Sequence, residues 1–369
     1  MTDRIFLSAG EPSGDLHGAA VVRALKARMP GVEIEAFGGP AMAAAGARIR
    51  WPMERYTVMG FAEIISKIPA HARLLGDLRR DLKAGRYRLV IPVDYPGFNL
   101  RVAEAAQAAQ VPVLYYVAPQ LWAWGAKRAA RFRKAVDRFA VIFPFEAPFF
   151  AKLGLAAEYV GHPLADRAVV PTRADARAAL GIPPDARVLS LFPGSRRQEL
   201  ARHWTAFRGA GAKLLAEGQV DRVLVATVAV GTYPDSGALE LLDADPMLVL
   251  AAADAVLAKS GTTTLEAALT DTPMVVAYRV HPFTAWLARR IMRVQWISLP
   301  NLIANRPVVT ELVQGEVKVD RLADAVRPLL DPDADATVTQ RADLAAVREQ
   351  LGGPGAAERV AELAATLLR

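Results

Sequence analysis

The sequence has no cysteine among its 369 residues, which excludes disulfide bonds, thiolate catalysis and cysteine-based zinc sites. Long hydrophobic runs are also missing: the most apolar stretch, Leu248 to Ala258, is interrupted by Asp254 and is too short to span a membrane. The first residues, Met1 to Arg4, lead straight into a predicted strand, so we expect no signal peptide. Together these absences predict a cytoplasmic protein, either soluble or bound at the periphery of a membrane.

Clustered metal ligands are missing as well. The five histidines are scattered, and no two of them have the spacing of metal ligands on one helix. We therefore expect no metal ion and no other cofactor. His162 lies in Gly161-His162-Pro163 at a predicted domain junction, where it either is structural or lines the cleft between domains.

The net charge of +7 is unevenly distributed. Residues 61–88 hold seven basic and three acidic residues (+4), and residues 127–138 hold six basic residues and one acid (+5). The rest of the chain is therefore slightly acidic. Both segments lie in the first half, which predicts that this half alone meets an anionic surface.

Short apolar segments alternate with amphipathic helical patterns along most of the chain, which predicts parallel βαβ units. One series runs to about residue 160, and a second begins at Val188 and continues to about Leu330. We predict an α/β fold of two doubly wound, Rossmann-like domains facing across a cleft. The expected domains are residues 1–165, residues 166–345, and a C-terminal helix within 346–369 that packs toward the N-terminal domain or a partner subunit.

One stretch fits this pattern poorly. The apolar segments 223–228 and 238–242 are separated by few residues, including Gly231 and Gly237. Parallel strands normally need a crossover of about a dozen residues or more. Either the connecting helix is absent here, or the two segments are not parallel neighbours.

Two strand-to-helix turns rich in small residues stand about 65 residues apart, Phe192-Pro193-Gly194-Ser195-Arg196 and Ser260-Gly261-Thr262. Such turns present free backbone N–H groups and helix dipole ends at one edge of a sheet, which favours a phosphate group. No lysine follows either turn as a P-loop requires. Arg196 adds a planar fork for two phosphate oxygens. The turns predict a nucleotide diphosphate site.

Glu266 follows the second turn by about one helical turn. One interpretation is that it complements the helix dipole. The interpretation that we favour is that its carboxylate accepts two ribose hydroxyls beside the predicted diphosphate.

The loop after the first predicted strand contains Gly10, Glu11, Ser13 and Gly14. Its spacing differs from G-x-G-x-x-G, and Gly38-Gly39 stands where a ribose-binding acid would follow the second strand, which argues against a nicotinamide cofactor. Glycine lets another molecule approach the backbone closely. We therefore predict that this loop lines the acceptor substrate.

Asp94 ends the apolar strand that precedes Tyr95-Pro96-Gly97-Phe98-Asn99. A carboxylate at the carboxyl end of a central strand faces the ligand crevice of an open α/β sheet. The alternative is a helix cap for a helix from Leu100, but Asn99 is better placed for that role. We predict that Asp94 is a general base for a bound hydroxyl.

Residues 61–83 show an apolar stripe at helical spacing with flanking Lys and Arg. Such a stripe either faces the core or rests on anionic lipid. The residues that we expect to contact lipid or acyl chains are Phe61, Ile64, Ile65, Ile68 and Leu75.

Taken together, these segments resemble the lipid-A-disaccharide synthase family of glycosyltransferases with the GT-B fold. The likeness covers nearly the whole chain and includes the turns above. It rests on further ordered motifs, among them Ser8-Ala9-Gly10-Glu11-Pro12-Ser13-Gly14-Asp15, Val58-Met59-Gly60-Phe61, Phe143-Pro144-Phe145-Glu146, Pro273-Met274-Val275-Val276-Ala277-Tyr278-Arg279 and Ser298-Leu299-Pro300-Asn301-Leu302-Ile303-Ala304.

The resemblance implies a reaction in lipopolysaccharide biosynthesis. UDP-2,3-diacylglucosamine donates its sugar to 2,3-diacylglucosamine 1-phosphate, with inversion and without a metal ion, to give the β-1,6-linked disaccharide and UDP. It also implies Asp94 as the base, Asn301 as a donor-site residue, and a location on the cytoplasmic side of the inner membrane. No nucleic acid partner is expected, and a homodimer is one option for the oligomeric state.

The sequence departs from the family pattern at two places. Gly97 stands where the family usually has a second acid, and the connection 231–237 is shorter than usual. The rival interpretations are another GT-B enzyme that uses a UDP-sugar, such as an N-acetylglucosamine transferase or a non-hydrolysing epimerase, and a UDP-sugar-binding peripheral membrane protein without catalysis.

Overall fold

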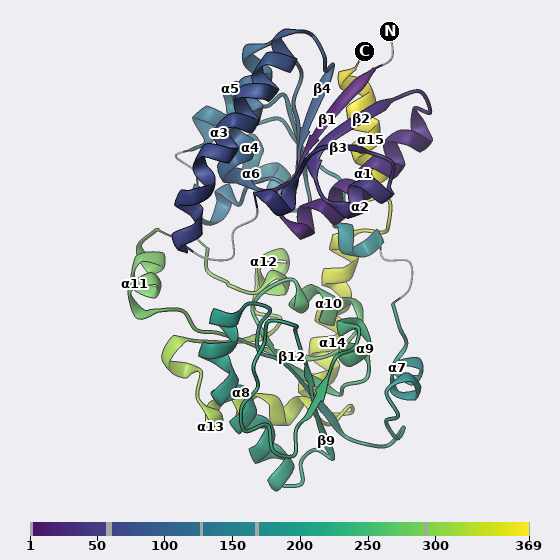
Figure 1. The fold of residues 1–369 in the computed structure, drawn as a ribbon. Helices are drawn as coiled ribbons and strands as arrows, with labels where there is room; N and C mark the ends of the chain where they lie inside the picture. Colours follow the sequence, from purple (N-terminus) through teal and green to yellow (C-terminus); the bar gives the residue numbers. More distant parts are fainter. Residues whose placement is uncertain (1–2, 57–60, 126–127, 167–169, 292–293, 369) are drawn as a thin grey trace. The chain divides into compact units, whose positions relative to one another are not determined.

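The computed structural model describes residues 3–56, 61–125, 128–166, 170–291 and 294–368. The chain forms two compact units, one made of Met1–Asp166 with Leu351–Arg369 and the other of Arg167–Gln350. Each unit is a parallel sheet with helices on its faces, so the predicted α/β class is confirmed (Figure 1). In the described part of the chain, no helix is both long and apolar enough to cross a membrane.

The first unit is built on parallel strands in the order β3-β2-β1-β4, continued by β5-β6-β7. Isolated parallel bridges from Val90 to Val113 and from Val93 to Tyr116 join the two sets. The strands are β1 (Arg4–Ser8), β2 (Glu33–Gly38), β3 (Arg48–Pro52), β4 (Leu89–Pro92), β5 (Leu114–Tyr116), β6 (Arg138–Val141) and β7 (Ala157–Tyr159).

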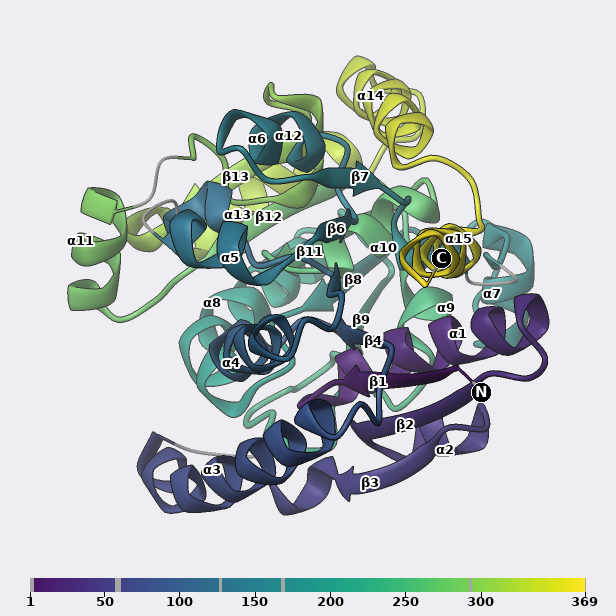
Figure 2. The ribbon, with the colours of Figure 1, turned by 90° about the horizontal axis from the view of Figure 1, so that it is seen from above.

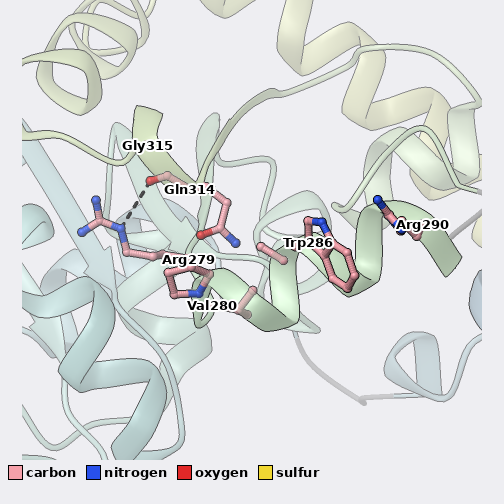
Figure 3. A pocket seen from close by; sticks show the side chains of 8 residues that line it. Arg279, Val280, Trp286, Arg290, Gln314 and Gly315 are labelled. Carbon is pink, nitrogen blue, oxygen red and sulfur yellow. Dashed lines mark hydrogen bonds between the residues drawn. The ribbon is translucent and has the colours of Figure 1, made fainter.

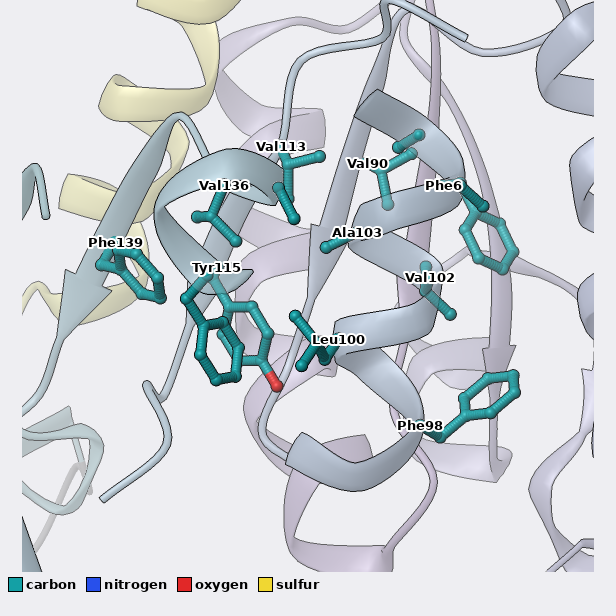
Figure 4. Packing of buried hydrophobic residues seen from close by; sticks show 14 of the residues in the cluster. Phe6, Val90, Phe98, Leu100, Val102, Ala103, Val113, Tyr115, Val136 and Phe139 are labelled. Atoms are coloured by element: carbon teal, nitrogen blue, oxygen red, sulfur yellow. The ribbon is translucent and has the colours of Figure 1, made fainter. Parts of the chain in front are cut away.

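The helices of this unit cover both faces of its sheet. They are α1 (Pro12–Arg28), α2 (Pro40–Ala44), α3 (Phe61–Lys83), α4 (Pro96–Ala108), α5 (Ala129–Ala135), α6 (Glu146–Lys152) and α15 (Ala356–Leu367). Side chains of α3, α4 and α5 form one core with Phe6, Val90 and Tyr115 of the strands. Figure 4 shows the part of this core around α4. Helices α1 and α15 pack together on the opposite face (Figure 2). Because both faces are covered, the central strand β4 is wholly buried and β1 is buried from Ile5 to Ser8.

The second unit contains six parallel strands in the order β10-β9-β8-β11-β12-β13. They are β8 (Val188–Phe192), β9 (Arg222–Ala226), β10 (Glu240–Leu242), β11 (Ala255–Lys259), β12 (Met274–Tyr278) and β13 (Thr310–Val313). Its helices are α7 (Arg173–Ala179), α8 (Arg197–Ala216), α9 (Pro246–Ala251), α10 (Thr263–Leu269), α11 (Pro282–Ile291), α12 (Leu299–Ala304), α13 (Val319–Val326) and α14 (Asp335–Leu351).

The connection between β9 and β10 has no helix, although the two strands are parallel neighbours. Tyr233 fills the place beside the sheet: its ring packs edge-on against Trp204 at 5.1 Å, and its hydroxyl accepts the N–H of Val228 at 3.0 Å. The Trp204 indole donates to the carbonyl of Pro234 at 2.8 Å. Of the two alternatives for this stretch, the absent helix is therefore correct.

The C-terminal segment is fastened to the end of the first series of elements. Asp166 accepts the backbone N–H groups of Gly355 (2.6 Å) and Ala356 (3.1 Å) at the start of α15. Arg359 donates to the carbonyl of Val160 at 2.7 Å, and the Tyr159 hydroxyl donates to that of Leu351 at 2.6 Å. Both passages of the chain between the units are thus tied to the first unit.

Glu146 is buried at the start of α6, where it fastens two loops. One carboxylate oxygen accepts the Trp122 indole N–H at 3.0 Å, and the other accepts the N–H groups of Ile142 (3.1 Å) and Phe143 (3.0 Å). Burial raises the pKa of Glu146 to about 7, although these three donors oppose the shift.

Because the folded pKa is raised above the ordinary value of 4.5, this group's contribution to stability is fully present below that value and is lost as the pH rises toward 7. Glu146→Gln should remove this pH dependence. It should also lower stability by about 1–3 kcal/mol, because an amide NH₂ group then faces a donor. Thermal melts of both proteins between pH 4.5 and pH 7.5 measure the effect, and parallel curves for the two proteins would contradict it.

Candidate functional site

Each unit has a point where its chain changes direction across the sheet. In the first unit β1 and β4 are neighbours, and the strands that follow each of them lie on opposite sides. In the second unit the same is true of β8 and β11. Open α/β sheets bind ligands at the carboxyl ends of the strands at such a point. The loops after these four strands carry most of the residues that the sequence singled out.

Asp94 and Tyr95, directly after β4, both have left-handed backbone conformations, with φ of 49° and 51°. This conformation is costly for a residue with a side chain. The Asp94 carbonyl is held by the Asn99 amide at 2.7 Å and by the Tyr115 hydroxyl at 2.8 Å. The strained turn is therefore fixed by two buried side chains.

Asn99 is not the helix cap that the sequence suggested, because α4 begins at Pro96 and contains it. Its amide also donates to the carbonyl of Ser8 at 3.0 Å, and its oxygen accepts the Ser8 hydroxyl at 2.6 Å. Asn99 thus ties the ends of β1 and β4 together.

The Asp94 carboxyl group is partly buried. Burial raises its pKa, and the nearby negative charge of Glu11 adds to this, while the N–H of Tyr95 opposes it. A carboxylate with a raised pKa is a stronger base than a free one, which suits proton abstraction.

The glycines of the first loop permit close packing at this point. A Cβ on Gly10 would lie 2.4 Å from the Tyr95 ring, and one on Gly14 would lie 3.2 Å from the Ala9 side chain. Ser13 is exposed and Glu11 precedes α1 as its cap residue. By contrast, a side chain at Gly97 would meet nothing within 4 Å, so packing does not exclude an acid there.

The ring of His71 connects α3 to Tyr95 in the loop after β4, a contact that the sequence analysis missed. Its Nε2 lies 3.2 Å from the Tyr95 hydroxyl, and its ring packs among Phe37, Tyr56 and Phe98. The spacing of one histidine among scattered aromatic residues gives no signal for such a contact.

Helix α3 faces two environments. Leu75 is 6% exposed and belongs to the core, so its predicted lipid contact is wrong, whereas Ile68 is 54% exposed. The side chains of Phe61, Ile64 and Ile65, like residues 58–60 of the family motif, lie outside the described part of the structure.

His162 is buried, and its Nδ1 accepts the N–H of Leu164 at 3.2 Å. Its ring packs on Phe143 at 5.3 Å. Burial, with a smaller effect of His17, lowers the pKa of His162 to about 3, so the ring is neutral. These contacts favour the structural alternative for this residue.

In the second unit, the turn after β8 requires its glycine. Gly194 has φ of 141°, and a Cβ there would lie 2.5 Å from the Cβ of Glu199. The N–H of Ser195 donates to Glu199 at 3.0 Å, and Arg196 is exposed at the start of α8.

Glu199 and Lys259 join the two predicted phosphate turns by a salt bridge of 2.8 Å. Burial raises the pKa of Glu199, but Lys259, the N–H of Ser195 and the charge of Arg196 together outweigh it, so the pKa lies below its ordinary value. The Lys259 ammonium group also lies 5.7 Å from the centre of the Tyr278 ring. The sequence analysis missed Lys259, although it directly precedes Ser260.

The second turn is held by its own side chains. The Ser260 hydroxyl donates to the carbonyl of Ile297 at 2.6 Å, and the Thr264 hydroxyl donates to that of Gly261 at 2.7 Å. Thr262 is exposed at the start of α10, and Glu266 is largely buried inside that helix.

The side chain of Asn301 joins α12 to β13. It is buried, its amide nitrogen donates to Val309 and Glu311 (both 2.9 Å), and its oxygen accepts the N–H groups of Val308 (2.7 Å) and Val309 (2.8 Å). These contacts give Asn301 a structural role, and its implied place in the donor site stays a prediction.

Comparison with known proteins supports the family resemblance. Residues 5–366 match the family model described as lipid-A-disaccharide synthetase. The lipid-A-disaccharide synthase of Geobacter metallireducens is 39% identical over 376 residues, which cover 99% of this chain and 97% of that protein.

Among solved structures, the glycosyltransferase of kitacinnamycin covers 100% of both chains with a TM-score of 0.64 at 19% identity. A putative UDP-N-acetylglucosamine 2-epimerase from Listeria monocytogenes covers 99% of this chain and 96% of its own, with a TM-score of 0.65 at 13% identity. At these identities the likeness concerns the fold alone, and it fits the two Rossmann-like units of the GT-B fold. With the family match over nearly the whole chain, the protein belongs to the lipid-A-disaccharide synthase family, the glycosyltransferases that form the lipid A disaccharide.

Proposed function

We propose that the chain joins 2,3-diacylglucosamine, carried by UDP, to 2,3-diacylglucosamine 1-phosphate in a single displacement that inverts the sugar. The acceptor hydroxyl oxygen forms a bond to the anomeric carbon, the bond from that carbon to the UDP oxygen breaks, and Asp94 takes the hydroxyl proton. The observation that carries this proposal is the strained, partly buried Asp94 at the direction change of the first sheet.

The loop after β1 is the neighbour of Asp94 and so the proposed wall of the acceptor site. Gly10 and Glu11 lie in this loop, and Ser13 and Gly14 lie in the first turn of α1 that follows it. Glu11 has a second role, because its charge helps to raise the pKa of Asp94.

The donor diphosphate is assigned to the turns after β8 and β11. The small residues Gly194, Ser195, Ser260, Gly261 and Thr262 leave the backbone accessible to phosphate oxygens. Arg196 supplies positive charge that stabilises the departing UDP, and Lys259, paired with Glu199, holds the two turns together. Glu266, in the first turn of α10, is the proposed acceptor for the ribose hydroxyls.

We further propose that the protein works in the cytoplasm on the inner-membrane surface, where both lipid substrates reside. The exposed Ile68 on α3, flanked by Lys67 and followed by Arg73, fits a helix that rests on anionic lipid. The basic segment 127–138 adds charge, and the helix α5 within it exposes Arg131 and Arg133.

The direct test of the reaction uses the two lipid substrates with the purified protein. Mass spectrometry should identify the tetraacyl disaccharide 1-phosphate and UDP, and NMR of the product should show the inverted, β-linked anomeric centre. Turnover of unacylated UDP-N-acetylglucosamine in place of the lipid donor would instead favour a different UDP-sugar enzyme.

Asp94→Asn should lower kcat by about 10²–10⁴, because the amide cannot take the proton, and it should leave UDP affinity nearly unchanged. In the wild-type protein, kcat/KM should rise with pH as Asp94 ionises. Glu11→Gln should move this rise to lower pH, because it removes a charge that raises the pKa of Asp94. An Asp94→Asn turnover within a few-fold of wild type would reject the assignment.

Arg196→Ala should lower kcat on the order of 10²-fold, because it removes a donor aimed at developing charge. Arg196→Lys should remain impaired, because it keeps the charge but loses the two-pronged geometry. Isothermal calorimetry with UDP measures how much the substitution weakens UDP binding. Arg197→Ala is the matched control, since Arg197 is the exposed neighbour on α8. Equal UDP binding by the Arg196→Ala variant and wild type would show that Arg196 points elsewhere.

Ile68→Ser should weaken sedimentation with anionic vesicles and leave the melting temperature unchanged, because Ile68 is exposed. Leu75→Ser, seven residues along the same helix, should instead lower stability by at least about 2 kcal/mol, because Leu75 is buried in the core. A large drop in melting temperature for Ile68→Ser would mean that Ile68 belongs to the core and would contradict the proposed lipid contact.

A further inference from the structure

The segment between Asp271 and Glu311 contains no acidic residue. Across these 39 intervening residues (272–310) the charges are five arginines, at positions 279, 289, 290, 293 and 306. The sequence analysis overlooked this segment, because acidic residues elsewhere in the second half offset its positive charge when the charge is summed over that half. Helix α11 lies inside the segment.

Helix α11 exposes large aromatic side chains. Phe283 is 65% exposed and Trp286 is 49% exposed, and their rings stack with centres 5.9 Å apart. The guanidinium group of Arg290 lies 4.3 Å from the centre of the Trp286 ring. Exposed aromatic residues with an arginine beside them form a surface that is apolar in the middle and cationic at the edge.

The helix is held at the periphery of its unit. In Figures 1 and 2 it lies outside the layer of helices that covers the sheet, and it has no extensive packing against another described helix or strand. Phe283 and Trp286 are therefore not part of the core of this unit.

A hollow of about 590 Å³ separates α11 from the ends of β12 and β13. Arg279, Val280, Trp286, Arg290 and Gln314 line it (Figure 3). Arg279 is fixed there, because its backbone N–H donates to His203 at 2.8 Å and its side chain donates to the carbonyl of Gln314 at 3.3 Å.

The acids nearest in the chain, Asp271, Glu311 and Glu316, have other partners. Asp271 forms a salt bridge with Arg348 at 2.8 Å. Glu311 accepts the N–H groups of Ile297 (3.0 Å) and Ser298 (2.8 Å), and Glu316 accepts the N–H of Val313 at 3.2 Å. Among the described residues, Arg279 and Arg290 form no salt bridge, so their positive charge is available to an anionic partner.

From this juxtaposition we propose that α11 is a second contact with an anionic bilayer surface, carried by the second unit. Phe283 and Trp286 enter the interface between headgroups and acyl chains, and Arg290 and Arg279 lie against lipid phosphates. This extends the membrane association proposed for α3, and it replaces the expectation that the first half alone meets an anionic surface.

The double variant Phe283→Ser/Trp286→Ser should bind phosphatidylglycerol-containing vesicles at least about tenfold more weakly, because two interfacial aromatic side chains are lost. Arg290→Gln should weaken binding about fivefold, which corresponds to about 1 kcal/mol for one cation at the surface. Val338→Ser is the matched control, since Val338 is 55% exposed on α14 of the same unit and lies outside the segment. Thermal melts check that each variant is folded.

The measurement is vesicle sedimentation beside steady-state kinetics with substrates in detergent micelles. Weaker vesicle binding with unchanged micellar kinetics supports the proposal. Unchanged vesicle binding with a raised KM for the acylated donor would overturn it and make the hollow an acyl-chain site. The proposal would also be overturned if the wild-type protein bound neutral phosphatidylcholine vesicles as strongly as phosphatidylglycerol-containing vesicles. Ile68→Ser, measured in parallel, separates the outcomes: an effect of Ile68→Ser alone overturns the α11 contact, and an effect of the α11 variants alone overturns the α3 contact.

Discussion

The proposed acceptor site depends on the hydrogen bonds of the Asn99 side chain. It binds Ser8 at the end of β1 and the carbonyl of Asp94 after β4, so one amide fixes the two loops that meet where the sheet changes direction. The left-handed backbone at Asp94 and Tyr95 costs on the order of 1–3 kcal/mol per residue, and it persists only because the surroundings determine it. Without the hydrogen bonds of Asn99, the Asp94 carboxylate would lose both its position and the partial burial that raises its pKa.

Buried or partly buried carboxylates that accept backbone N–H groups fix several other loops in the same way. Asp15 accepts the N–H groups of Gly39 and Ala41 at 2.8 Å, both at the start of α2. Asp166 does so at the start of α15, and Glu311 does so before α12. Each pair satisfies N–H groups that a helix or turn leaves without an internal partner. The loops around the proposed site are thus positioned by polar contacts, while the apolar strands provide the base beneath them.

The sequence predicted what local pattern determines and missed what tertiary contact determines. The alternation of strands and helices, the glycine turn at Gly194 and the position of Asp94 at a strand end all follow from short-range residue choice. Leu75 was misassigned because its burial depends on which elements pack above it, which periodicity does not reveal. Lys259 was missed because its partner, Glu199, lies 60 residues earlier and is brought to it only by the pairing of β8 with β11.

The charged side chains of the two proposed substrate sites have different tasks, and each set lies on its own sheet. Glu11 lies near Asp94, and a second negative charge keeps the affinity of a base for protons high. At the other site Arg196 supplies positive charge to a diphosphate, while Lys259 is paired with Glu199 and joins the two turns. A cation beside Asp94 would instead lower the pKa of the base. Each sheet, with its own direction change, therefore carries one of these two kinds of group.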